Sequence, residues 1–179
     1  MKQKLTVFNI IPDEKNVIKV RLPFGTGGEK LTFAQGDQLV AEDLVAGTRD
    51  QYEGKLVTTA TDETVIIFNQ NVYKDEFGNR HGFVQNPSLI RYESGELVTA
   101  VRPSRNVKLQ ISKDAITGAI VNGQYLVPQV ASEANEDTFG LTVTADATGY
   151  ATAYKIENAD ETIEIGNAKY VQAPIVRTM

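Results

Sequence analysis

The chain has 179 residues, of which 41% are hydrophobic and none is cysteine. This length can bury a core without disulfides or metals, and the absence of cysteine excludes disulfide frameworks, thiolate catalysis and thiolate zinc sites. The net charge of −5 argues against a nucleic-acid binder, because phosphate binding depends on clustered basic side chains. We therefore expect one domain, or two small ones, with no nucleic acid as partner.

Residues 1 to 24 are predicted to form an extended N-terminal segment in which Pro12 and Pro23 frame a strand. The apolar runs near its start are short and are interrupted by Asn9 and Pro12, so they are neither a signal peptide nor a membrane span. We therefore expect the protein to stay in the cytosol where it is made, with no membrane partner. The segment either supplies a first strand of the core or reaches out as an arm.

Residues 25 to 115 are predicted to form one β domain, and residues 116 to 179 a C-terminal β region that can belong to the same domain. Short runs rich in Val, Ile, Thr, Tyr and Phe indicate strands, and turns rich in glycine, asparagine and aspartate separate them. The predicted fold class is all-β, a short-stranded β-sandwich or β-barrel with tight turns. Helical turns are expected only at residues 36 to 45 and 112 to 115.

The stretch NQNVYKDEFGNRHGF, residues 69 to 83, gathers the chain's one histidine, His81, with Asp75 and Glu76. Strand-like residues flank it, and the letters DEFGN suit a tight hairpin turn. The spacing of these three side chains matches no metal-binding motif. We therefore predict a hairpin with the charged residues at its tip, and no metal or cofactor.

Three other segments have the look of functional motifs but support simpler interpretations. GTGGEKLT, residues 25 to 32, lacks the glycine before and the hydroxyl after Lys30 that a phosphate-binding loop requires. SEANEDTFG, residues 132 to 140, lacks the alternating oxygen ligands of a calcium loop and is predicted to be a solvated linker. The basic stretch at residues 101 to 113 is interpreted as a solvated strand edge, or alternatively as a docking surface for an acidic partner; its basic residues are Arg102, Arg105, Lys108 and Lys113.

The stretch ESGELVTAVRPSRNVKLQISKDAITGAIVNGQYLVP, residues 93 to 128, together with the closing strands, resembles the small β-rich proteins that decorate or cement the heads of tailed bacteriophages. The rest of the chain shares their character, with no cysteine or tryptophan and many short strands. The resemblance implies a non-enzymatic virion protein that binds the major capsid protein on the outer capsid surface and stabilises the shell. It also implies assembly in the host cytoplasm and a homo-oligomer, a dimer or a trimer.

Attachment by strand addition would suit the N-terminal segment, and the predicted capsid contacts there are apolar residues: Val7, Phe8, Ile10 and Ile11. The alternative function is a head-fibre, tail or adhesion module that binds host carbohydrate through aromatic residues around the hairpin: Tyr73, Phe77 and Phe83. A third alternative is a glycosidase or nucleotide hydrolase on a β-barrel. No nucleophile elbow or ordered triad is visible, so we predict no catalytic residues and no enzyme.

Overall fold

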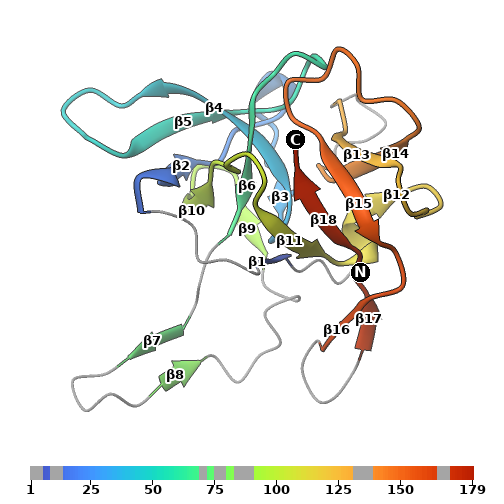
Figure 1. The fold of residues 1–179 in the computed structure, drawn as a ribbon. Coiled ribbons are helices and arrows are strands. Elements are labelled where there is room, and N and C mark those ends of the chain that lie inside the picture. The colour runs from blue at the N-terminus through green and yellow to red at the C-terminus, as the bar shows by residue number, and fades with distance from the viewer. Residues whose placement is uncertain are drawn as a thin grey trace.

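The structure, a computed structural model, describes residues 6–8, 14–68, 72–74, 80–82, 91–130, 139–164 and 170–179. Within these ranges every regular element is a β-strand or a short 3-10 turn, which confirms the all-β prediction. The described strands form a closed five-stranded barrel, a seven-stranded sheet and three two-stranded ribbons (Figure 1).

The barrel joins its strands in the order β10–β2–β5–β4–β6. Their bounds, in that order, are Leu97–Val101, Val17–Arg21, Gln51–Lys55, Gln38–Leu44 and Thr64–Ile67. β2 runs parallel to β5, and the other neighbours are antiparallel. Because side chains alternate along a strand, β2 turns Ile18 and Val20 into the barrel, where they join a buried cluster that also includes Leu39, Val65, Ile67, Val98 and Ala100.

The seven-stranded sheet has the order β1–β11–β18–β15–β13–β14–β12. Its strands, in that order, are Thr6–Phe8, Lys108–Ile111, Ile175–Thr178, Tyr154–Asn158, Tyr125–Pro128, Leu141–Thr144 and Ile116–Thr117. One face of the sheet forms a second buried cluster with Leu109, Leu126, Tyr154 and Val176, and this cluster includes Ile66 of barrel strand β6. Since β6 contributes Ile66 to one cluster and Val65 and Ile67 to the other, it separates the two cores.

Strands from all three predicted segments are neighbours in this one sheet. β1 comes from residues 1 to 24, β11 from residues 25 to 115 and β18 from residues 116 to 179, and they pair in that order. The segments therefore share a sheet and do not each build their own.

Three ribbons and three short turns complete the described elements. β3, Thr32–Phe33, pairs with β9, Tyr92–Glu93; β7, Val72–Lys74, with β8, Arg80–Gly82; and β16, Thr162–Glu164, with β17, Tyr170–Gln172. The 3-10 turns are η1, Glu14–Asn16; η2, Thr26–Gly28; and η4, Lys113–Ala115. The last of these confirms the helical turn predicted at residues 112 to 115.

The helical turn predicted at residues 36 to 45 is wrong, because this stretch contains β4. β4 pairs with β5 on one edge and with β6 on the other, and Leu39 enters the barrel core with no exposed surface. Pairing on both edges and burial outweigh the weak local helix preference. Gly47 lies in the turn between β4 and β5 and has φ of 81°.

A buried polar junction ties the barrel to the sheet. The Oε1 atom of Gln38 in β4 accepts hydrogen bonds from Thr64 Oγ1 at 3.0 Å and from the Tyr154 hydroxyl at 3.2 Å. Its Nε2 atom donates to the carbonyl of Gly36 at 3.1 Å. Burial raises the pKa of Tyr154, so its hydroxyl keeps the proton that it donates. Each polar group of the junction thus has a partner where water is excluded.

Phe139 makes a second tie across the same boundary. Its ring stacks on Phe33 with centroids 4.6 Å apart, and its carbonyl accepts a 2.7 Å hydrogen bond from the backbone N–H of Gln38. The solvated linker predicted for residues 132 to 140 is therefore wrong at its end, since Phe139 and Gly140 are buried. A side chain at Gly140 would collide with the carbonyl of Ala115. Residues 131–138 lie outside the described ranges.

We predict that the substitution Gln38→Ala lowers the free energy of unfolding by about 2–4 kcal/mol, because it leaves two buried hydroxyl groups without an acceptor and opens a cavity. Tyr154→Phe removes one donor and should cost only about 1 kcal/mol. Urea denaturation followed by circular dichroism measures both. The matched control, Gln51→Ala on half-buried β5, should change stability by no more than about 0.5 kcal/mol. Equal losses for both glutamine variants would contradict the role given to the junction.

Candidate functional site

The N-terminal segment supplies an edge strand to the sheet of its own chain. The backbones of Val7 and Phe8, two of the predicted capsid contacts, lie opposite Gln110 and Leu109 of β11. Thr6 is buried, and its Oγ1 atom lies only 2.6 Å from where a Cβ on Gly36 would be. β1 therefore pairs with the sheet, and the Thr6 side chain lies against the barrel loop. The other two predicted contacts, Ile10 and Ile11, lie outside the described residues.

The predicted hairpin is present as the pair β7 and β8, with Tyr73 opposite His81 and Lys74 opposite Arg80. His81 thus lies within β8, which corrects the prediction that it is at the hairpin tip. The register leaves the five residues 75 to 79 to connect the strands. The remaining predicted residues of this region lie outside the described ranges: Asp75, Glu76, Phe77 and Phe83.

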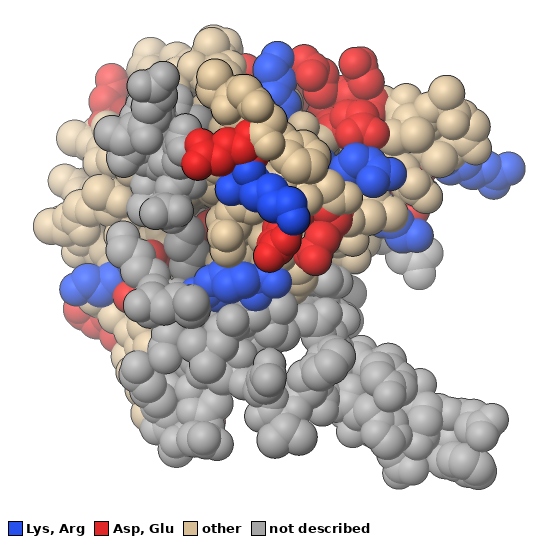
Figure 2. All heavy atoms as spheres, turned by 180° about the vertical axis from the view of Figure 1, so that it is seen from behind, with Lys and Arg blue, Asp and Glu red and all other residues tan. Residues whose placement is uncertain are grey.

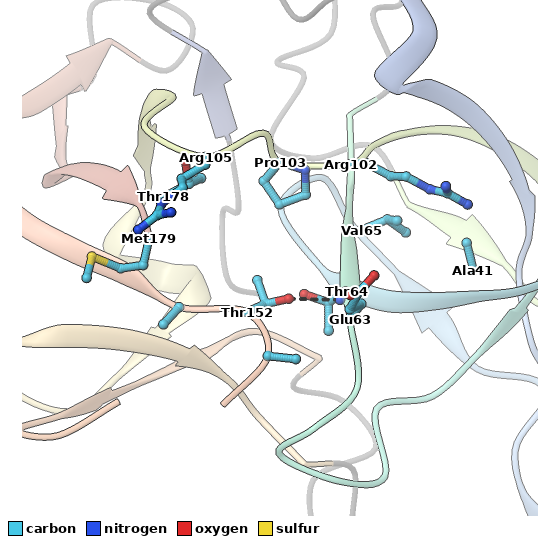
Figure 3. Close-up of a pocket in the computed structure, with 12 residues that line it drawn as sticks. Ala41, Glu63, Thr64, Val65, Arg102, Pro103, Arg105, Thr152, Thr178 and Met179 are labelled. Carbon is cyan, nitrogen blue, oxygen red and sulfur yellow. Dashed lines mark hydrogen bonds between the residues drawn. The ribbon is translucent and has the colours of Figure 1, made fainter. Parts of the chain in front are cut away.

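A cavity of about 380 Å³ lies between the barrel and the sheet (Figure 3). On its floor the backbone N–H of Thr64 donates to Thr152 Oγ1 at 3.0 Å. The guanidinium of Arg102 stands 4.7 Å from the ring centroid of Tyr52, and Figure 3 shows the Arg102 side chain directed away from Arg105, Thr178 and Met179, toward the side where Ala41 lies. The rest of the cavity lining combines the charged side chains of Glu63 and Arg105 and the hydroxyl of Thr178 with the apolar residues Ala41, Val65, Pro103, Ala151, Ala153 and Met179. The cavity is therefore lined by charged, hydroxyl-bearing and aliphatic side chains that come from both the barrel and the sheet.

A row of cations crosses the outer face of the seven-stranded sheet. Lys108 of β11 lies directly opposite Arg177 of β18, which lies opposite Lys155 of β15. Their neighbours Leu109, Val176 and Ile156 point into the core, so alternation turns the three basic side chains to the other face. We call Lys108, Arg177 and Lys155 the cationic row.

One carboxylate serves this row. Glu157 binds Lys108 Nζ through Oε2 at 2.7 Å and Arg177 Nε through Oε1 at 2.9 Å. The hydrogen bond from Lys108 lowers the pKa of Glu157, and the charges of Lys108, Arg177 and Lys155 lower it further. No ion pair joins Lys155 to a carboxylate of the described residues. The outer face therefore carries an excess of positive charge at this row.

Charges on the barrel are balanced in exposed pairs instead. Four cross-strand or cross-ribbon ion pairs join Lys19 to Asp50, Arg21 to Glu53, Lys55 to Glu42 and Lys30 to Glu93. Figure 2 shows basic and acidic side chains interspersed over one face of the molecule. The cationic row differs from these pairs because two of its three basic side chains bind the same carboxylate and the third is joined to none among the described residues.

Sequence reasoning found only one member of the row. Lys108 belongs to the basic stretch at residues 101 to 113, and the acidic-partner alternative was raised for that stretch, whereas Lys155 and Arg177 lie in later strands. Alternation in YKIE and IVRT places a basic residue beside a core residue in both strands. This alternation indicates an outward direction, but only the pairing register brings the three side chains together.

Within the described ranges, no group of three or more histidine, aspartate and glutamate side chains is placed to hold a metal ion. No helix found there is long and apolar enough to cross a membrane. Comparisons of the chain with protein-family models, with curated proteins and with solved structures found no match.

We predict that Glu157→Gln destabilises the protein at neutral pH, because it removes the one carboxylate that binds Lys108 and Arg177 and leaves like charges opposite each other. The loss should be no more than about 1 kcal/mol, because surface ion pairs contribute little to stability. A carboxylate with a lowered folded-state pKa stabilises above its unfolded pKa, and this contribution is lost as pH falls through the folded pKa. The wild type should therefore lose its advantage over Glu157→Gln in acid, and also at high salt. Urea midpoints compared across pH and salt test this, and a pH-independent difference would contradict it.

Proposed function

We propose that this protein is a non-enzymatic virion structural protein that binds the outer surface of a tailed-bacteriophage capsid and stabilises it. The resemblance of residues 93 to 128 to capsid decoration proteins gives the class of partner, the major capsid protein. The position of β1 at the end of the seven-stranded sheet is the observation that supports an attachment route.

β1 pairs with β11 along one edge, and no described strand pairs along its other edge. The backbone N–H and C=O groups of an edge strand can accept a further strand from another chain. We therefore propose that β1 receives a strand of the capsid protein, with Val7 and Phe8 supplying part of the contact. In this scheme the segment is a docking edge fixed to the body, and not an arm reaching away from it.

A rigid attachment of this kind suits reinforcement of a shell. Docking on a repeated lattice makes successive binding events effectively intramolecular, so modest individual contacts give strong attachment. Binding only to the assembled shell stabilises that shell by mass action. The protein needs no catalytic group for such a role.

The alternative function, a head-fibre, tail or adhesion module that binds carbohydrate, is favoured by one observation. Tyr170 at the start of β17 is 65% exposed, and exposed aromatic rings with a polar tip are suited to recognition surfaces. A glycan array separates this alternative from capsid binding, since a decoration protein should bind none of the glycans.

We predict a homo-oligomer, a dimer or a trimer, in solution or on the shell. Short strands leave sheet edges, such as β12 at the end opposite β1, and closed symmetric association is a common way to cover them. Multi-angle light scattering of the free protein and mass measurement on particles test this. A monomer in both settings would count against it.

We predict that particles lacking the protein still form but release DNA at a lower temperature, and that added protein restores their heat stability. A variant lacking residues 1–8 loses β1 yet keeps every barrel strand, so it should stay folded and fail to restore stability. Removing residues 1–24 also removes β2, whose Ile18 and Val20 lie in the barrel core, and should unfold the protein.

The control lacks residues 1–5 only and keeps β1. It should restore heat stability as the full chain does, and circular dichroism reports the fold of each variant. Particles that are equally heat-stable with and without the protein would overturn the proposed function. Full restoration by the variant lacking residues 1–8 would overturn the role of β1 alone.

A further inference from the structure

We propose that the cationic row, Lys108, Arg177 and Lys155, binds an acidic segment of a partner protein. The acidic chemistry of the partner follows from the row itself. That the partner is a capsid protein rests on the proposed function above.

The row is a feature that the fold alone disfavours. Residues directly opposite each other on neighbouring antiparallel strands have Cβ atoms about 4.5–5.5 Å apart, and like charges at such positions destabilise a sheet. Here three cations follow one another across three adjacent strands. Three positive charges against the one carboxylate of Glu157 leave an excess of two, on a chain whose net charge is −5. An acidic ligand would neutralise this excess.

Lys155 is the member of the row that no ion pair joins to a carboxylate of the described residues. Glu157 forms ion pairs with Lys108 and Arg177, whereas it interacts with Lys155 only by longer-range electrostatic attraction. Next to Lys155 across the sheet lies Tyr125 of β13, which is half-buried. A carboxylate bound at Lys155 would therefore have an aromatic ring beside it, where an apolar or uncharged side chain of the same segment can pack.

The size of the row favours a short protein segment over nucleic acid. Three neighbouring strands span about 10 Å, which is the reach of about three residues of extended peptide. Binding to duplex DNA typically uses about 6–10 phosphate contacts, and the row offers three cations of which two already hold Glu157. The negative net charge of the chain also repels a long polyanion.

The test uses three fluorescent probes at low salt: a short peptide of alternating glutamate and threonine, the same peptide with glutamine for glutamate, and a single-stranded oligonucleotide. Fluorescence anisotropy with the full chain gives the dissociation constants. The glutamate peptide should bind, and the glutamine peptide should not. The variant Lys155→Glu should raise the dissociation constant for the glutamate peptide about tenfold or more, because it places a like charge at the contact.

The matched control is Lys113→Glu, which makes the same charge change at an exposed lysine in η4, beyond the other end of β11. It should leave peptide binding nearly unchanged. Lys155→Gln, which removes the charge without adding a new one, should give an intermediate loss, and urea denaturation confirms that each variant is folded.

Three results would overturn the inference: no binding of the glutamate peptide, equal weakening by both charge-reversal variants, or tighter and Lys155-dependent binding of the oligonucleotide. The assay contains no capsid, so its failure leaves the heat-release test of the proposed function standing. Peptide binding that depends on Lys155, together with particles unaffected by the protein, would support the acidic contact and reject a shell protein as the partner.

Discussion

The amide of Gln38 is the point on which the arrangement of barrel and sheet depends. Its backbone belongs to barrel strand β4, its N–H is bonded to Phe139, and its side chain accepts from Thr64 in the barrel and Tyr154 in the sheet. Leaving a buried amide group without a hydrogen-bond partner costs more free energy than an average hydrogen bond contributes to stability. Any rotation or sliding of the sheet on the barrel would therefore break these buried hydrogen bonds.

The connection between barrel and sheet also determines how firmly β1 is fixed to the rest of the protein. The described part of β1 has three residues, Thr6–Phe8, and strand pairing over three residues would be weak by itself. It pairs, however, with β11, and its first residue, Thr6, is buried with its side chain against the barrel loop at Gly36. A load applied at the edge of β1 would pass into both the sheet and the barrel. For the proposed role in reinforcing a shell, a strand fixed in this way would transmit force better than an unattached segment.

Local pattern predicted the strands well and the long-range features poorly, for identifiable reasons. The alternating run NVIKVRL and the continuous apolar run TVIIF are local patterns, so β2 and β6 could be predicted from the sequence alone. β4 could not, because its state is decided by two partner strands. The burial of Phe139 could not be predicted, because the residues before it are acidic and its stacking partner, Phe33, is far away in the sequence. The cationic row could not be predicted, because it depends on the pairing register of three strands. In β15 and β18 the alternation with core residues shows only that Lys155 and Arg177 point outward.

The edge of β1 and the cationic row belong to the same sheet, but they offer a partner different interactions: backbone hydrogen bonds at the edge and charge complementarity at the row. Backbone pairing at an edge gives affinity with little dependence on the partner's sequence. Charge complementarity adds orientation and discrimination, because a wrongly placed cation of the partner would be repelled. Lys108 belongs to β11, the strand that also pairs with β1, so a partner strand docked at β1 would lie two strands away from the start of the row. A chain continuing from such a strand across the outer face would meet Lys108 first and Lys155 last, which gives the contact a defined direction.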